Sequence, residues 1–283
     1  MHTGAPKEAY DALLNQYEEG MDSATIDRIF GELKEELVPF VQQILKAKQP
    51  DDSKFQGGFD VDAQEKVQKM KKGIIFDMDG TLWDSGVSIA EAWNIVIERR
   101  GLNKANFTAD DIHGIMGKTI DGIADALFEE YSKEERMDIT RECLVYENEY
   151  LAEHGGELYE KLEDVLIELS KNYPLYIVSN CEKGYIEGFL KYYGFGKYFK
   201  DFESHGNTGL SKGQNIRLVA ERNGLTDVVY VGDIQSDYNA SKEAGVGFIH
   251  AAYGFGTIQE EVLTVSYMKE IPMAVEKYFE MIQ

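Results

Sequence analysis

Hydrophobic residues near the start of the chain recur at the spacing of one helix face. Over residues 22–48 the apolar positions are Ile26, Ile29, Phe30, Leu33, Leu37, Phe40, Val41, Ile44 and Leu45. This spacing predicts an amphipathic helix, which Pro39 should kink or divide. Residues 48–64 are rich in turn formers and predict a linker or an irregular excursion. We therefore expect a helical segment over residues 1–70.

From residue 73 onward the pattern changes to short apolar runs that alternate with longer helical patterns. The runs predict strands at 73–77, 175–180, 228–233 and 247–253, with a weaker one at 198–204. Continuous apolar strands separated by helices are typical of a parallel sheet that is covered on both faces. The sequence thus predicts the α/β class, with a Rossmann-like parallel sheet.

One long gap breaks this alternation. Residues 86–158 contain several helical patterns, one of which has Thr119 as a candidate N-cap, and no convincing strand. We expect a helical domain at 87–158, inserted into a core formed by residues 71–86 and 159–283.

Composition narrows the possible partners. The formal net charge of -22 disfavours nucleic acid and anionic membrane surfaces, because both need a basic footprint. Hydrophobic residues make up 43% of the chain, which is ordinary for a soluble globular protein. Cys143 and Cys181 are too few and too far apart for a disulfide framework or a zinc site. With no apolar signal core, we expect a cytoplasmic setting.

Polar residues gather where the predicted strands end. Asp77 ends the first strand, with Asp79 two residues further, and Ser179 and Asn180 end the second. The remaining polar positions of this kind are Asp233, which ends the strand at 228–233, Asp237, one turn further, and Lys212, which opens a predicted helix. Ligands bind beyond the carboxyl ends of strands in open parallel sheets, so we expect these side chains to converge.

This set of residue types suits phosphoryl transfer. An aspartate can attack phosphorus and form an acyl phosphate, while a second carboxylate protonates the leaving oxygen and then activates water. Several carboxylates close together repel one another unless a cation lies between them, and Mg²⁺ prefers oxygen ligands. Lys212 and the Ser179 hydroxyl can hold the other phosphate oxygens.

The same residues resemble the haloacid dehalogenase superfamily over about residues 73–255. "DMDGT", "IVSN", the lysine of "SKGQNI" and "VGDIQSD" are similar to its four motifs in order. The resemblance implies that Asp77 is the nucleophile and Asp79 the general acid and base. It also implies Mg²⁺ held by Asp77, the Asp79 carbonyl and Asp233, with Asp237 as a further metal-side carboxylate. The predicted phosphate-binding residues are Gly80, Thr81 and Asn180, and the helical insertion resembles a C1-type cap.

Members of the superfamily catalyse different reactions, and particular residues indicate which reaction this chain carries out. Dehalogenases of the superfamily lack the second aspartate, so Asp79 favours phosphorus chemistry. Sugar phosphomutases carry a histidine and an arginine near positions that Ile89 and Ile120 occupy here. We expect a phosphatase similar to the phosphoglycolate phosphatase group, acting on a small phosphorylated metabolite, and phosphomutase activity stays an alternative. Cap residues His113, Met116 and Lys118 are candidates for specificity, and Lys118 is a candidate contact for an anionic substrate.

The N-terminal segment resembles an internal helical stretch of Taq-type metallocarboxypeptidases over about residues 9–65. The likeness rests on "ELVP" and on Tyr10, Leu13, Leu14, Tyr17, Glu18, Gly20 and Met21. The His-Glu-x-x-His zinc motif of those enzymes is missing, so no peptidase role is carried over. An amphipathic helix of this kind needs a partner for its apolar stripe. The partner is either the rest of the chain or a second copy, and the second case predicts self-association through the N-terminal helices. A binding or assembly protein is therefore a further alternative.

Overall fold

The computed structural model describes residues 23–46 and 71–282, and the chain divides into two compact units, Met1–Gln64 and Glu65–Gln283. In the first unit, α2 (Ser23–Lys46) confirms the helix predicted from apolar spacing. The helix continues through Pro39, so the expectation that proline divides it is wrong; proline removes one backbone hydrogen bond, and the other turns of a long helix retain theirs. The predicted linker lies outside the described residues.

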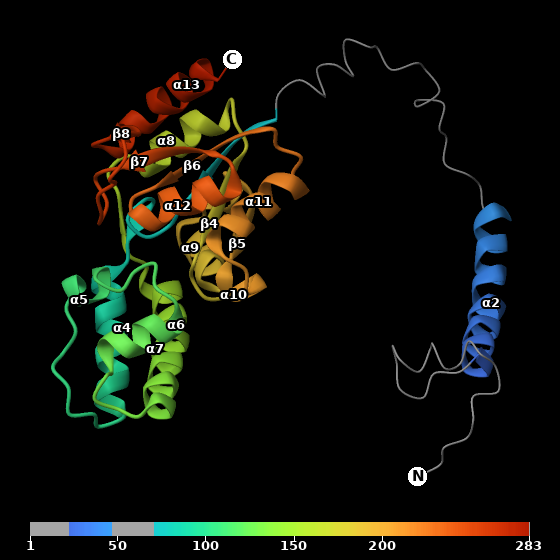
Figure 1. The fold of residues 1–283 in the computed structure, drawn as a ribbon, viewed down its shortest axis with the longest axis horizontal. Helices are drawn as coiled ribbons and strands as arrows, with labels where there is room; N and C mark the ends of the chain where they lie inside the picture. Colours follow the sequence, from blue (N-terminus) through green and yellow to red (C-terminus); the bar gives the residue numbers. More distant parts are fainter. Residues whose placement is uncertain (1–22, 47–70, 283) are drawn as a thin grey trace. The chain divides into compact units, whose positions relative to one another are not determined.

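A six-stranded parallel sheet forms the core of the second unit (Figure 1). Its spatial order is β5-β4-β1-β6-β7-β8, and every neighbouring pair is parallel. The strands are β1 (Lys72–Phe76), β4 (Leu175–Ser179), β5 (Phe199–Ser204), β6 (Asp227–Gly232), β7 (Gly247–Ala251) and β8 (Leu263–Val265). The α/β class is confirmed. The short edge strand β8 was not predicted, because three residues carry too little periodicity.

Alternate residues of the strands face two separate layers of helices. On β1, Ile74 and Phe76 pack on one side and Ile75 packs on the other. The first side is covered by α8 (Leu162–Ser170), α9 (Tyr185–Tyr193) and α13 (Ile271–Met281), and the second by α11 (Lys212–Arg222) and α12 (Gln235–Ala244). Both faces of the strands are thus dry, which explains their unbroken apolar runs.

Four helices between β1 and β4 form a separate group, here called the cap helices (Figure 1). They are α4 (Gly86–Arg99), α5 (Ala109–His113), α6 (Ile120–Leu127) and α7 (Lys133–His154). Two short antiparallel strands connect them to the core, β2 (Trp83–Asp84) and β3 (Glu157–Leu158). Thr119 caps α6 as predicted, since its side chain accepts a hydrogen bond from Gly122 N. Whether this group is an independent domain stays a prediction.

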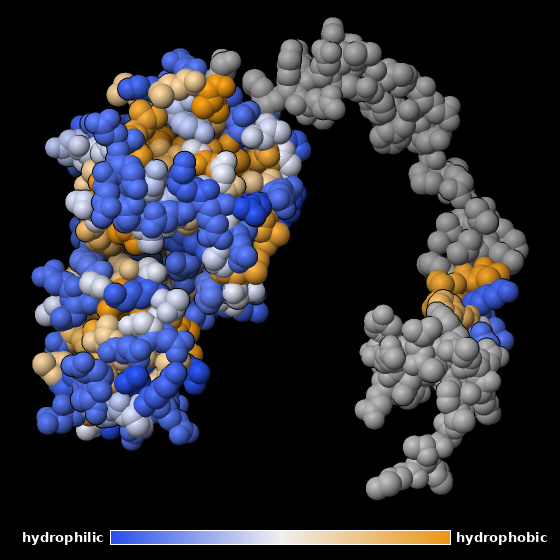
Figure 2. Space-filling model, viewed as in Figure 1, coloured by the Kyte–Doolittle hydropathy of each residue, from blue (hydrophilic) through white to orange (hydrophobic). Residues whose placement is uncertain are grey.

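Short helical turns complete the fold: η1 (Phe195–Lys197), α10 (His205–Thr208) and η2 (Met268–Glu270). The face in Figure 2 shows a mainly hydrophilic surface over residues 71–282, with apolar side chains in small patches. On α2 the same figure shows a hydrophobic stretch, where Ile29, Phe30 and Leu33 are exposed. Among the described helices, none combines the length and the apolar character that crossing a membrane requires.

Candidate active site

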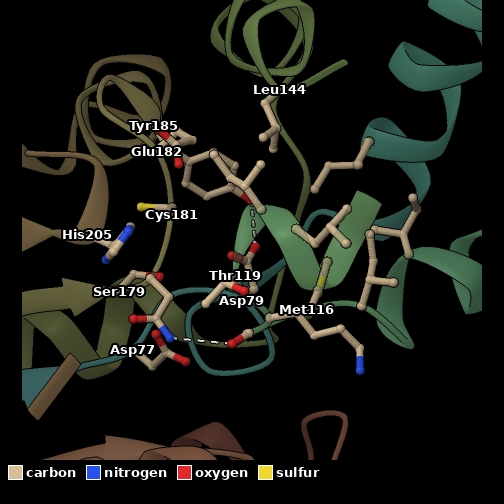
Figure 3. A pocket seen from close by; sticks show the side chains of 18 of the residues that line it. Asp77, Asp79, Met116, Thr119, Leu144, Ser179, Cys181, Glu182, Tyr185 and His205 are labelled. Carbon is tan, nitrogen blue, oxygen red and sulfur yellow. Dashed lines mark hydrogen bonds between the residues drawn. The ribbon is translucent and has the colours of Figure 1, made fainter. Parts of the chain in front are cut away.

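The sheet topology brings the ends of three strands together. β1 lies between β4 and β6, so connections leave it in both directions and a crevice opens where the strand order reverses. Asp77 follows β1, Ser179 ends β4 and Asp233 follows β6. The amide of Asp77 donates to the Val231 carbonyl at 2.9 Å, which ties the end of β1 to β6. Figure 3 shows Asp77, Asp79 and Ser179 at one end of the resulting cavity.

Three buried carboxylates form a cluster at this crevice. Oxygen atoms of Asp77, Asp233 and Asp237 lie within 4.8 Å of one another. Both oxygens of Asp237 have partners: Oδ2 accepts from the amides of Asp233 (3.1 Å) and Ile234 (3.2 Å), and Oδ1 accepts from Lys212 at 2.6 Å. Asp237 is therefore fixed by its own helix start and by Lys212, and its expected role as a metal-side carboxylate stays a prediction.

Lys212 lies between two of these carboxylates. Its Nζ is 2.6 Å from Asp237 Oδ1 and 3.0 Å from Asp77 Oδ1. Burial lowers the pKa of Lys212, but the neighbouring Asp237 and Asp77 more than reverse this, so the pKa lies above its ordinary value. A cation at the first residue of α11 opposes the helix dipole, and the two carboxylates compensate. Removing one member of such a buried ion pair costs about 3–5 kcal/mol.

Two carboxylate oxygens of the cluster have no hydrogen-bond donor among the residues that the structure describes. They are Asp77 Oδ1, whose contact with Lys212 is an ion pair without hydrogen-bond geometry, and Asp233 Oδ1. Burial, and after it the neighbouring Asp237, raises the pKa of both Asp77 and Asp233. Buried anionic oxygens without donors are the donor set that a hard divalent cation needs, so the residues present fit Mg²⁺.

Glycine is required directly beside this cluster. Gly80 has φ +80°, and a Cβ built there would lie 2.0 Å from Asp233 Oδ2. The same Oδ2 accepts a hydrogen bond from the Phe255 amide at 2.7 Å. The loops after β1, β6 and β7 therefore pack so closely that a side chain at position 80 would displace Asp233.

Asp79 points toward a pair of hydroxyl groups. Its Oδ1 accepts from Ser85 Oγ at 2.6 Å and from Tyr185 OH at 2.7 Å, and Figure 3 shows Tyr185 and Asp79 facing each other. Burial raises the pKa of Asp79, while these two hydrogen bonds lower it in part. Sequence reasoning missed both partners. Ser85 lies in the same loop as Asp79 and could have been noticed, whereas Tyr185 carried no sequence signal.

A cavity of about 320 Å³ lies over the strand ends and contacts the cap helices. Most of the predicted site residues line it, namely Asp77, Asp79, Lys118, Ser179, Asn180, Lys212 and Asp233. Gly80, Thr81 and Asp237 are not among its lining residues. Thr81 is fully buried and its Oγ1 has no partner among the described residues, so its predicted phosphate contact stays a prediction.

The cap side of the cavity is mainly apolar. Its lining includes Ile89, Trp93, Ile112, Ile115, Met116, Ile120, Ile123 and Leu144. Glu147 of α7 lies in this wall and is only 6% exposed. It accepts a hydrogen bond from Trp93 Nε1 at 2.7 Å, and burial raises its pKa to about 8. Glu147 was missed because nothing in the sequence distinguishes it from the other acids of α7.

Several contacts join the cap helices to the core beside the cavity. His113 Nε2 lies 2.9 Å from Asp84 Oδ1, and the His113 ring stacks on Phe255 at 4.2 Å. Asn180 Nδ2 donates to the Gly117 carbonyl at 3.4 Å. Trp83 is fully buried, and its ring packs edge to face against that of Tyr185. His113, Met116 and Lys118 all line the cavity, with Lys118 exposed, and their roles in specificity stay predictions.

Comparisons with known proteins agree with this geometry. The phosphoglycolate phosphatase of Yersinia pseudotuberculosis serotype I is 24% identical over 195 residues, which cover 66% of this chain and 83% of that enzyme. A haloacid dehalogenase-like hydrolase structure from Streptococcus pneumoniae has a TM-score of 0.59 at 23% identity, covering 73% of this chain and 97% of that one. A β-phosphoglucomutase structure from Clostridium difficile has a TM-score of 0.57 at 16% identity, covering 75% and 100%. The two structures establish likeness of fold.

Two family models match different parts of the chain. The model of carboxypeptidase Taq (M32) metallopeptidases matches residues 1–87, in agreement with the predicted resemblance of the N-terminal segment. The model described as haloacid dehalogenase-like hydrolase matches residues 74–251. That match spans more than half of the sequence, from the first aspartate motif to the end of β7. The chain therefore belongs to the haloacid dehalogenase-like hydrolase family.

Proposed function

We propose that this protein is a Mg²⁺-dependent phosphatase that hydrolyses a small phosphorylated metabolite through a phosphorylated Asp77. The observation that carries the proposal is the convergence of Asp77, Asp79, Lys212 and Asp233 on one cavity. Curated relatives of the chain include phosphoglycolate phosphatases, which supports phosphoryl chemistry on small molecules. Both cysteines are free thiols, as suits the expected cytoplasmic setting.

The reaction divides into two displacements at phosphorus. In the first, an Asp77 carboxylate oxygen attacks, the bond from phosphorus to the leaving oxygen breaks, and Asp79 gives that oxygen a proton. In the second, Asp79 takes a proton from water, the water oxygen attacks phosphorus, and phosphate leaves as Asp77 is restored. Lys212 and Ser179 hold the non-reacting phosphate oxygens in both steps.

The metal role is assigned to a specific group of oxygens. Asp77 and Asp233 would hold Mg²⁺ through their donor-free Oδ1 atoms, together with the Asp79 carbonyl. A bound Mg²⁺ neutralises phosphate charge and stabilises the carboxylates beside it. Both oxygens of Asp237 already accept hydrogen bonds, so Asp237 is proposed to orient Lys212 beside the metal site without binding the metal directly.

Phosphomutase activity is the less favoured reaction. Ile89 and Ile120 stand where mutases are expected to carry a histidine and an arginine, and both isoleucines line the cavity. Neither side chain can move a proton or bind a second phosphate. The proposal therefore predicts that turnover needs no bisphosphate activator, and a strict dependence on one would contradict it.

A steady-state assay tests the phosphatase proposal. Purified protein would be given 4-nitrophenyl phosphate and a panel of phosphorylated metabolites, with Mg²⁺ or with a chelator. We expect turnover that Mg²⁺ restores after chelation. Hydrolysis that proceeds unchanged in the chelator, or no hydrolysis of any compound, would reject the proposal.

Self-association through the N-terminal helices is proposed separately. It is motivated by the apolar residues along α2, of which Phe30 is 64% exposed. Size-exclusion chromatography with light scattering would compare the full chain with Phe30→Asp. A dimer that Phe30→Asp dissociates supports the idea, and two monomers would refute it.

A further inference from the structure

The cap wall of the cavity contains one ionisable group whose role the proposed reaction does not explain. Ile89, Ile123 and Leu144 make this wall apolar, and Glu147 interrupts it. Among the described cap-helix residues that line the cavity, Glu147 is the only carboxylate. A carboxylate buried in an apolar wall is costly unless it binds something, which makes Glu147 a candidate for substrate recognition.

The hydrogen bonding of Glu147 is incomplete. Trp93 Nε1 donates to Oε2 at 2.7 Å, and this is the one hydrogen bond that Glu147 has within the described residues. Trp93 also lines the cavity, so the pair stands side by side in the wall. The indole fixes one oxygen and leaves Oε1 for a group in the cavity, because a carboxylate accepts several hydrogen bonds.

The charges around Glu147 are negative. Burial is the main cause that raises the pKa of Glu147, the Trp93 hydrogen bond lowers it, and the nearby Asp79 and Glu182 raise it further. No ion pair reaches Glu147 in the described part of the chain. An anionic group placed here would face uncompensated carboxylates, at a cost. A hydrogen-bond donor would instead complete the coordination of Oε1, and a cationic donor would also supply the missing counter-charge.

We propose that Glu147 is a specificity-determining residue that selects leaving groups with an apolar body and a hydrogen-bond donor, an amine or a hydroxyl, and that rejects leaving groups ending in a carboxylate. The assignment of the phosphate end to Asp77 rests on the proposed function. The proposed selectivity of Glu147 argues against phosphoglycolate as the preferred substrate of this chain, because the leaving group of phosphoglycolate carries a carboxylate.

Lys118 offers the competing reading. It is an exposed cation that lines the same cavity, and it could attract a carboxylate end. The two residues therefore predict opposite orders of affinity: Glu147 favours a ligand that ends in an amine or a hydroxyl, and Lys118 favours one that ends in a carboxylate. A carboxylate preference that Lys118→Met abolishes would assign specificity to Lys118 and overturn the role of Glu147.

Binding of matched, non-hydrolysable ligands tests the inference directly. The probes are alkylphosphonates of graded length that end in methyl, hydroxyl, ammonium or carboxylate, titrated calorimetrically into the full chain with Mg²⁺ at pH 9, where Glu147 is ionised because its pKa is about 8. For the best chain length we expect the ammonium and hydroxyl ends to bind about tenfold more tightly than the carboxylate end. In Glu147→Gln this preference should fall about tenfold. Glu149→Gln, the same change at an exposed position of α7, is the matched control and should keep the preference.

The outcomes separate this inference from the phosphatase proposal. Equal or tighter binding of the carboxylate end by the unmodified chain, a preference that survives Glu147→Gln, or no binding of any probe would overturn the inference. The comparison of probes on the unmodified chain decides the matter even if Glu147→Gln does not fold. Turnover of the corresponding alkyl phosphates is measured in parallel. If the preference is found and no phosphate is hydrolysed, the phosphatase proposal fails while the selectivity of the cavity stands.

Discussion

The two sides of the cavity differ in kind. The core side is a dense set of charges, with Asp77, Asp233, Asp237 and Lys212 all buried and within ion-pair or metal-ligand distance. The cap side is a wall of isoleucine, leucine and tryptophan side chains around Glu147. The core positions depend on backbone topology, since strand ends in a parallel sheet converge whatever lies above them. The cap positions depend on how four helices pack.

This difference teaches where chemistry and selectivity are set. Charges that are fixed by strand ends and helix starts have positions set by the backbone, which suits the proposed phosphoryl chemistry. A helical wall changes with any substitution along α4, α6 or α7, so it can adapt to the leaving group. This division between catalysis in the core and selectivity in the cap would be contradicted if core substitutions changed selectivity alone, or if cap substitutions abolished catalysis.

Removing the proposed nucleophile should give the largest effect. Asp77→Asn keeps the shape of the side chain but cannot form an acyl phosphate, so kcat should fall at least about a thousandfold. Hydrolysis of 4-nitrophenyl phosphate measures it, with circular dichroism to check folding. Asp164→Asn, at an exposed position on α8, is the control and should leave kcat unchanged. Comparable kcat for Asp77→Asn and the unmodified chain would show that the core charges are not the reaction centre.

Disturbing the packing of the core loops should rank second. Gly80→Ala places a Cβ against Asp233 and should lower kcat by about a hundredfold, since Asp233 must move. Gly245→Ala has a similar φ of +76° but no atom within 4 Å of the new Cβ. It adds backbone strain without a clash, so it should cost stability and retain activity. Equal losses of kcat in the two variants would mean that strain, and not the contact with Asp233, is responsible.

These core features were also the ones that the sequence could predict. Asp77, Asp79 and Asp233 come directly after apolar runs, so the strand pattern placed them at one sheet edge before any coordinates. The cap wall could not be derived in this way. Glu147 and Trp93 lie 54 positions apart on two helices, and only their packing brings them together. Tyr185 reaches Asp79 from α9, 106 positions away, for the same reason.

Tyr185 lies where the two sides meet, and its loss should have an intermediate effect. Tyr185→Phe removes one donor to Asp79 Oδ1, which should lower kcat about threefold to tenfold. A hydrogen bond to a carboxylate lowers its pKa, so losing it should move the kinetic pKa assigned to Asp79 to higher pH. The pH profile of kcat measures this shift. Tyr192→Phe, on the same helix and exposed, should leave the profile unchanged, and a matching shift there would contradict the assignment.

Glu147 ranks last among the effects on kcat, because its expected effect is on stability and not on catalysis. Its pKa rises from 4.5 in the unfolded chain to about 8 in the fold, so the folded state binds the extra proton between these values. Stability from this group is therefore full below the lower value and is lost as pH rises through the window, by about 1 kcal/mol per pH unit. Glu147→Gln removes this pH-dependent contribution to stability. The melting temperature of the variant minus that of the unmodified chain should therefore increase from acidic to alkaline pH. A constant difference across the range would contradict the buried, raised-pKa state.

Covalent labelling tests the central claim most directly. The protein would be mixed with a ³²P-labelled substrate and Mg²⁺, quenched with acid within the first turnover, and digested for mass spectrometry. We expect a phosphoryl group on the Asp77 carboxylate and none after Asp77→Asn, as the proposed mechanism requires. Turnover that leaves no label, or a label on Ser179 in place of Asp77, would contradict it.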